Sequence, residues 1–205
     1  MKSLRTCLVL LLIGLTMSFA ISGSSYAQDG EYMIDPAHSQ VIFKVKHLAI
    51  STVTGSFDLF EGTYSFDEEN IDNSSVQTNI VASSINTNEQ ERDDHLKSKE
   101  FLDVEKYPNI TFKSTAIKKG NDSNFQIIGD LTIHGVTKEI TLDANYEGHI
   151  TSDPWGKERT AFVANGKINR KDFGMTWNKA LELGGVVVGD EIKITLEVEG
   201  IRKTS

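Results

Sequence analysis

The chain has 205 residues, of which 39% are hydrophobic and 24% are charged. This length and composition suit one domain with a sizeable core and are too small for two. Acidic residues outnumber basic residues by 29 to 21, which gives a formal net charge of −8. Because such a charge repels phosphate backbones and anionic lipid surfaces, the composition argues against nucleic-acid binding.

The N-terminus has the features of a secretory signal peptide. Two basic residues precede an apolar run at residues 8–21, and small residues then offer a cleavage site after Ala27. We predict that residues 1–27 are a cleaved signal and that residues 28–205 form one domain, periplasmic or secreted and not integral to a membrane. An uncleaved anchor is the alternative, although the apolar run is short. The one cysteine, Cys7, lies in the signal, so no disulfide is expected.

Most of the remaining chain alternates apolar and polar residues with period two, which is typical of β-strands that bury one face. Turn-forming residues separate the alternating runs. A kink or bulge is expected at Gly55, and Gly62 is expected to break the run that follows. The eight runs cover residues 41–47, 57–66, 76–80, 110–117, 125–133, 140–146, 162–168 and 192–198.

The segment at residues 89–101 interrupts this alternation and predicts a short helix. Asn86 and Thr87 are suited to cap it, acidic residues crowd its first turns, and Lys97 lies near its end, an order that matches the helix dipole. Pro108 disfavours a helical residue before it and is expected to stop the helix. A short polar helix among strands is expected to lie beside the sheet as a plug or lid.

About eight strands, mostly joined as hairpins and without a βαβ rhythm, predict an all-β fold. An antiparallel sheet of eight strands closes without edges as a barrel and can enclose one small ligand. A two-sheet sandwich is the alternative, because the pattern alone does not separate the two. The small inward residues Gly129, Ala164 and Gly166 favour a tunnel over a filled interior.

Five separated blocks of the chain stand out: residues 35–48 (DPAHSQVIFKVKHL), 92–114 (RDDHLKSKEFLDVEKYPNITFKS), 129–138 (GDLTIHGVTK), 170–175 (RKDFGM) and 188–192 (VGDEI). In this order they resemble the YceI-like family of polyisoprenoid-binding proteins, over about residues 32–201. The resemblance implies an eight-stranded, lipocalin-like barrel that is exported to the periplasm. It also implies a role in binding, sequestration or transport of a long-chain isoprenoid, such as a polyprenyl phosphate or a quinone-like lipid, or of a fatty-acyl lipid. No cofactor is implied.

Apolar residues on the inward faces are candidates for contact with a hydrocarbon chain, since each buried methylene contributes about 0.8 kcal/mol. The alternative for any one of them is a role in a filled core. Phe173, Met175 and Trp177 fit ligand contact better, because they lie in an irregular, glycine-bearing segment at the expected barrel mouth. The predicted lining set is Val41, Phe43, Val45, Phe57, Leu59, Phe112, Ile127, Phe162, Ile168, Phe173, Met175 and Trp177.

A polar head group is expected near residues that flank the same segment and near two histidines: Arg170, Asn178, Lys179, His38 and His47. Arginine suits a phosphate because its guanidinium group can donate two parallel hydrogen bonds. For Arg170 the equal alternative is a structural ion pair with Asp172 or Glu182.

Enzymatic activity is not predicted, and a His-dependent enzyme is the least favoured reading. The five histidines (His38, His47, His95, His134 and His149) have no metal-ligand spacing, and no Gly-x-Ser-x-Gly elbow is present. No metal is predicted. A stress-related protein-interaction module without a ligand is the other alternative, which a solid interior and an external apolar patch would indicate. No motif bears on a homodimer, which the sequence leaves open.

Overall fold

The computed structural model describes residues 30–121, 123–180 and 185–203, so the predicted signal peptide and Glu182 lie outside the described residues. The strands are β1 (Gly30–Ile34), β2 (Gln40–His47), β3 (Ser51–Phe57), β4 (Phe60–Phe66), β5 (Ser75–Val81), β6 (Ile85–Asn86), β7 (Asn109–Lys119), β8 (Asn124–Ile133), β9 (Val136–Ile150), β10 (Arg159–Asn169) and β11 (Val188–Arg202). The helices are α1 (Gln90–Lys97) and the 3₁₀ turns η1 (Ile71–Asn73), η2 (Ala82–Ser84) and η3 (Arg170–Phe173).

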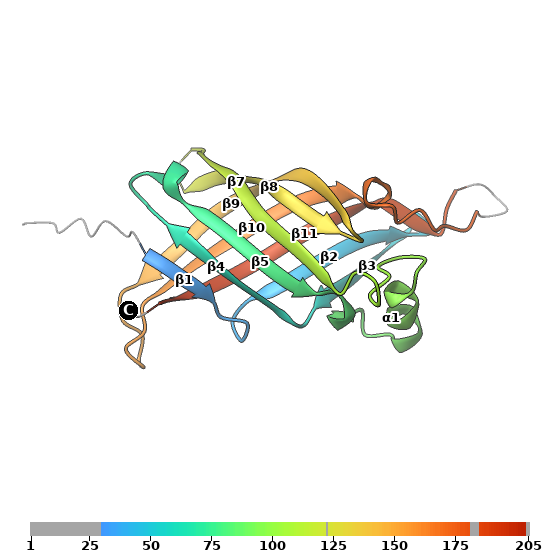
Figure 1. Ribbon diagram of the computed structural model, residues 1–205, viewed down its shortest axis with the longest axis horizontal. Coiled ribbons are helices and arrows are strands. Elements are labelled where there is room, and N and C mark those ends of the chain that lie inside the picture. The colour runs from blue at the N-terminus through green and yellow to red at the C-terminus, as the bar shows by residue number, and fades with distance from the viewer. Residues whose placement is uncertain (1–29, 122, 181–184, 204–205) are drawn as a thin grey trace, which may run out of the picture.

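Eight of these strands close into an antiparallel barrel (Figure 1). The pairing order is β1-β4-β5-β7-β8-β9-β10-β11, and β11 pairs with β1 to complete the circle. The barrel predicted from the sequence is therefore confirmed. A sandwich would leave free edges between its two sheets, and this closure removes them.

The hairpin of β2 and β3 lengthens the barrel wall toward α1 (Figure 1). Strand β11 is long enough to pair with two strands in succession, at Tyr32↔Arg202 in β1 and at Gln40↔Glu197 in β2. Strand β3 continues the sheet beyond β2 and is met by the short β6. Strand β1 and helix α1 thus lie at opposite ends of the long axis.

The period-two pattern determines which side chains face inward. In β7, Ile110 and Phe112 are buried whereas Thr111 and Lys113 are exposed. The same alternation places the apolar residues of the other long strands on one continuous inner surface. The alternation in the sequence therefore corresponds to the inside and the outside of the barrel.

The kink or bulge predicted at Gly55 and the break predicted at Gly62 are both wrong. Strand β3 runs through Gly55 in unbroken register with β2, and Gly62 lies within β4 opposite Thr78. At Gly55 the missing side chain makes room for a neighbouring ring, since a Cβ there would lie 2.4 Å from Cζ of Phe43. The break occurs instead between β3 and β4, where the Leu59 amide bonds the Ser84 hydroxyl at 3.0 Å.

Helix α1 is shorter than predicted, and its cap is a different residue. The side chain of Glu89 accepts hydrogen bonds from the amides of Glu91 and Arg92, so Glu89 is the cap in place of Asn86 or Thr87. The helix ends at Lys97, and turns fill the segment up to Pro108, which therefore does not stop the helix. The predicted position of α1 beside the sheet is confirmed (Figure 1).

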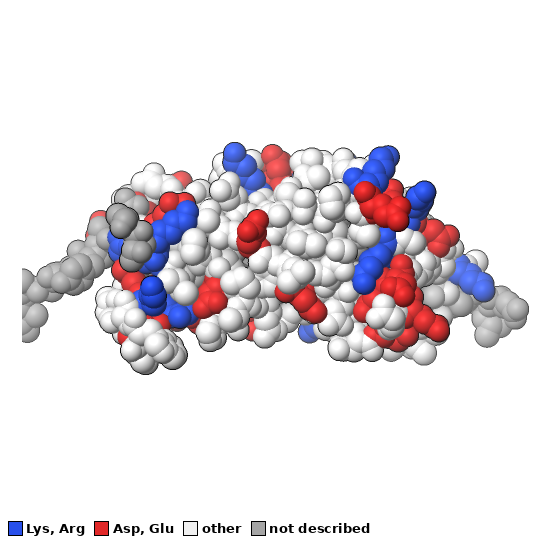
Figure 2. Space-filling model, turned by 60° about the horizontal axis from the view of Figure 1, so that its bottom comes forward, with Lys and Arg blue, Asp and Glu red and all other residues white. Residues whose placement is uncertain are grey.

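On the face shown in Figure 2, charged side chains gather toward the two ends of the molecule and leave a largely uncharged band between them. The acidic group at the right-hand end lies over α1. Within the described residues, no helix combines the length and the hydropathy that a transmembrane span requires.

Candidate functional site

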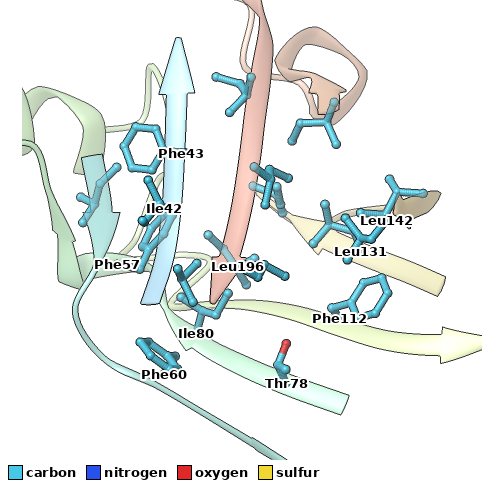
Figure 3. Close-up of a pocket in the computed structure, with 18 of the residues that line it drawn as sticks. Ile42, Phe43, Phe57, Phe60, Thr78, Ile80, Phe112, Leu131, Leu142 and Leu196 are labelled. Carbon is cyan, nitrogen blue, oxygen red and sulfur yellow. The ribbon is translucent and has the colours of Figure 1, made fainter. Parts of the chain in front are cut away.

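The barrel encloses a cavity of about 550 Å³. Strands from all around the barrel contribute side chains to its wall, and Figure 3 shows 18 of them around a common space and labels ten. Nine of those ten are leucine, isoleucine or phenylalanine, and the hydroxyl of Thr78 is the one polar group among them. A cavity of this size and apolarity falls in the usual range for small-molecule sites.

Ten of the twelve residues predicted to line a tunnel do line this cavity. They come from five strands and from the segment after η3, and their roles as ligand contacts stay a prediction. These residues are Val41, Phe43, Val45, Phe57, Phe112, Ile127, Phe162, Ile168, Met175 and Trp177.

Leu59 and Phe173 lie outside the lining, contrary to prediction. Leu59 is 60% exposed, because the irregular step between β3 and β4 places Phe57 and Phe60 on the inner face and turns Leu59 outward. Phe173 belongs to η3, where it is 1% exposed and packs into the core behind the cavity wall. Its carbonyl lies 3.2 Å from Nδ1 of His134.

The three small residues that were predicted to favour a tunnel have different surroundings. Ala164 lines the cavity. Gly129 and Gly166 are instead covered by larger neighbours. A Cβ at Gly129 would lie 2.5 Å from Phe112 Cζ, and a Cβ at Gly166 would lie 2.5 Å from Leu142 Cδ2. The two glycines therefore seat side chains that line the cavity, and only Ala164 leaves open space as predicted.

Aromatic rings close the cavity at the end near β1. Tyr64, Phe66 and Phe162 line it directly. Phe162 meets Tyr64 edge-on with ring centroids 5.4 Å apart, and it meets Phe66 in the same way at 4.9 Å. Tyr32 stacks on the outer side of Tyr64 at 5.2 Å and is fully buried. We call Tyr64, Phe66 and Phe162 the aromatic floor.

Polar contacts hold this end closed from outside. The Tyr64 hydroxyl lies 2.5 Å from the buried Thr160 hydroxyl, and burial raises the pKa of Tyr64, so the phenol stays neutral. The Tyr32 hydroxyl donates to Glu158 at 3.0 Å, and Arg202 also bonds that carboxylate. Burial would raise the pKa of Glu158, but the hydrogen bonds from Arg202 and Tyr32 outweigh it and hold the pKa below its usual value.

The opposite end, beside α1, carries the charged residues that line the cavity. They are Lys46, Glu89, Glu91, Arg92 and Arg170, and two histidines, His47 and His95, line the same end. We call this end the mouth. The sequence did not indicate Glu89, Glu91, Arg92 or His95 as lining residues, because α1 has almost no apolar pattern that would show which of its faces points to the barrel.

A buried aspartate orients Arg92 at the mouth. Asp93, 7% exposed, accepts hydrogen bonds from the amide of Thr87 at 2.9 Å and from its hydroxyl at 2.5 Å. The hydroxyl oxygen of Thr87 in turn accepts from Nε of Arg92 at 2.8 Å, and the Thr87 carbonyl accepts from Nη2 at 2.9 Å. The guanidinium group of Arg92 is thus held in place on one side. Within the described chain, its Nη1 has no hydrogen-bond partner.

Trp177 lies at the mouth against two side chains near α1. Its ring meets His95 edge-on at 4.8 Å and Phe101 at 5.3 Å. His95 also lies 2.6 Å from Glu100 through Nε2. His95, which the sequence left to solvent, therefore joins the rim of the cavity.

Arg170 is a structural residue. It is 1% exposed, and all five N–H groups of its guanidinium have acceptors, which are the carbonyls of Met175, Trp177, Val188 and Gly189 and the carboxylate of Asp190. The alternatives left open by the sequence are decided in favour of an ion pair, with Asp190 as the partner in place of Asp172. No donor remains for a head group.

The other predicted head-group residues are dispersed. His47 lines the cavity, but Asn178, Lys179 and His38 do not. The amide of Asn178 bridges the main chain of Val188, giving a hydrogen bond at 2.7 Å and accepting one at 3.1 Å. Lys179 is exposed.

His38 is exposed on the outer surface and belongs to an ion-pair network around Arg159. Its Nδ1 lies 2.9 Å from Asp35, which Arg159 contacts at 2.9 Å. Arg159 also binds Asp153 and Glu199. Asp35, His38 and Glu199 are close enough to share a cation, but the guanidinium group of Arg159 already neutralises the two carboxylates.

Comparison with known proteins agrees with this geometry. The model of the YceI-like domain matches residues 32–200. The chain belongs to the YceI-like family. Protein YceI of Salmonella newport is 41% identical to it over 194 residues, which cover 94% of this chain and 97% of that protein. A UPF0312 protein of Yersinia enterocolitica is 42% identical over 193 residues, with 93% and 96% covered.

Solved structures show the same barrel as this YceI-like protein. The YceI protein of Campylobacter jejuni is 35% identical, with a TM-score of 0.67 over 78% of this chain and 90% of that one. BcnA of Burkholderia cenocepacia, 23% identical, gives a TM-score of 0.72 over 81% and 98%. A polyisoprenoid binding domain from Saccharophagus degradans, 15% identical, gives 0.62 over 84% and 98%. The last two share the fold.

Proposed function

We propose that this YceI-like protein binds a long-chain isoprenoid or another amphiphilic lipid inside its barrel and sequesters or transports it in the periplasm. The observation that carries the proposal is the polarity of the cavity. Its wall is mostly apolar, with a few uncharged polar residues such as Ser74 and Thr78, its β1 end is lined by aromatic rings, and the charged lining residues gather at the mouth. An amphiphile has the same distribution, with an apolar chain and one polar end.

The energetics favour a long apolar chain. Ten buried methylenes contribute roughly 8 kcal/mol before the ordering costs of association, whereas one charge-assisted hydrogen bond contributes about 1.5–3 kcal/mol. The chain would therefore supply most of the affinity, and the head group would set its direction. A structural neighbour with this fold is a polyisoprenoid binding domain, which supports the same class of ligand. The predicted signal peptide supports the periplasmic location.

The first experiment is native mass spectrometry of the protein purified from its own host, with extraction and identification of bound lipids. Periplasmic release by osmotic shock checks the location in the same preparation. We expect an isoprenoid or fatty-acyl species at one per barrel. The contrary result is a ligand-free mass that does not increase with geranylgeranyl phosphate, a quinone or palmitic acid. That result would favour a protein-interaction module.

Arg92 is the best-placed cation for an anionic head group, because its Nη1 is left to bond a ligand at the mouth. Arg92→Met is expected to weaken binding of geranylgeranyl phosphate about tenfold or more, the equivalent of one charge-assisted hydrogen bond. Binding of geranylgeraniol, which lacks the phosphate, should change little. Titration of delipidated protein measures both, and Lys99→Met, which removes an exposed cation outside the cavity lining, is the matched control. Equal losses for the two lipids would contradict the assignment.

A further inference from the structure

We propose that the aromatic floor of Tyr64, Phe66 and Phe162 sets the maximum length of the apolar chain that this protein accepts. The inference rests on the proposed lipid binding and adds a selectivity to it. A chain that enters at the mouth with its head group outermost runs toward β1, where the floor rings line the end of the cavity. The distance from the charged mouth to these rings therefore limits the length of the chain that fits inside the barrel.

The floor is built as a rigid stop. Phe162, on β10, meets four other rings, those of Tyr64, Phe66, Phe125 and Tyr146, with centroids between 4.9 and 5.9 Å away. Rings in such edge-on and tilted contacts fill space at the density of a protein interior. No single ring can move without displacing its neighbours.

A second layer stands behind the first. Tyr32 stacks on Tyr64 with an angle of 10° between the rings, and Tyr146 lies 5.0 Å from Phe66. Neither Tyr32 nor Tyr146 belongs to the cavity lining. Gly200 seats the Tyr64 hydroxyl so closely that a Cβ there would lie 2.1 Å from the oxygen. A chain end that reaches the floor consequently meets two layers of rings.

A stop of this kind predicts a break in the dependence of affinity on chain length. Below the break, each added methylene enters the apolar wall and lowers the Kd about fourfold. Beyond the break, added carbons must fold back or remain outside the mouth, so the Kd stays level or rises. In a tunnel open at both ends the affinity would also level off once the chain emerges, but the break would not move with the size of the floor residues.

The test uses saturated fatty acids from decanoic to docosanoic acid, titrated into delipidated protein, with Phe162 changed in opposite directions. Phe162→Ala removes the ring at the centre of the floor and is expected to move the break to a longer acid. Phe162→Trp enlarges the floor and is expected to move it to a shorter one. Phe162→Leu is the milder shortening in case the alanine variant unfolds, which thermal melting by circular dichroism would reveal.

Phe43→Ala is the matched control, because Phe43 lines the cavity but pairs with Phe57, away from the floor. This variant should weaken the binding of every fatty acid by a similar factor and leave the break at the same chain length. The proposal is overturned if the break stays at the wild-type length in the floor variants, or if the wild type shows no break. If the wild type binds neither the acids nor isoprenoids, the proposed function itself has failed, which is a different result from an unmoved break.

Discussion

Replacement of Arg170 by methionine is expected to lower the free energy of unfolding by about 3–5 kcal/mol, because each carbonyl that loses its donor costs about 1–3 kcal/mol. Methionine fills a similar volume but donates nothing. The carbonyls of Met175, Trp177 and Gly189 would then lose their donors in a buried setting. These acceptors belong to the segment that leads from η3 to β11, so the mouth of the barrel should loosen first. Urea unfolding followed by circular dichroism and tryptophan fluorescence measures the change.

Lys171→Met is the control for Arg170→Met, because it removes an exposed ion pair with Asp190 and keeps the buried hydrogen bonds of Arg170. Lys171 contacts the same carboxylate of Asp190 at 2.8 Å, but its side chain is 46% exposed. An exposed ion pair contributes about 0–1 kcal/mol, so this variant should be nearly as stable as the wild type. If Arg170→Met is equally stable and instead weakens binding of a polyprenyl phosphate, then Arg170 serves the ligand and its structural role is refuted.

The barrel could be predicted because its main determinant is local. Alternation with period two indicates the inner face of each strand without knowledge of its neighbours, and eight half-buried strands without a βαβ rhythm leave few folds. The break between β3 and β4 could not be predicted in the same way. It depends on contacts with the end of the neighbouring strand β5 and with η2, where the Val81 amide bonds the Leu59 carbonyl at 2.9 Å and Ser84 bonds the Leu59 amide. The glycine at position 55 suggested a kink or bulge, but its missing side chain instead makes room for the ring of Phe43.

The cavity wall could be predicted for the same reason as the strands, whereas the mouth could not. The position of Arg92 follows from the buried contact between Asp93 and Thr87, and an aspartate in the first turn of a helix would usually be read as solvated. The partner of Arg170 follows from the start of β11, which brings Asp190 beside η3 across a gap of 20 residues in sequence. Charged residues acquire their roles from tertiary neighbours, which a pattern in the sequence does not contain.

A variant in the cavity wall can distinguish a lipid carrier from an interaction module with a solid interior. Ala164 lines the cavity from β10 and is 5% exposed. Ala164→Phe is expected to place a ring in the open space and to weaken binding of geranylgeranyl phosphate at least 100-fold, since displacement of about four methylenes removes roughly 3 kcal/mol. Titration of delipidated protein measures the loss.

The stability of the same variant carries the stronger argument. A ring inserted into a filled core forces its neighbours apart and costs about 1–3 kcal/mol, whereas a ring that enters an empty apolar cavity gains contacts without displacing any. We therefore expect Ala164→Phe to unfold at the same urea concentration as the wild type or a higher one. Ala164→Val, which adds two methyl groups, should keep most of the binding. Loss of stability together with unchanged binding would mean that the interior is not the site of the lipid, and the exposed surface would then have to account for function.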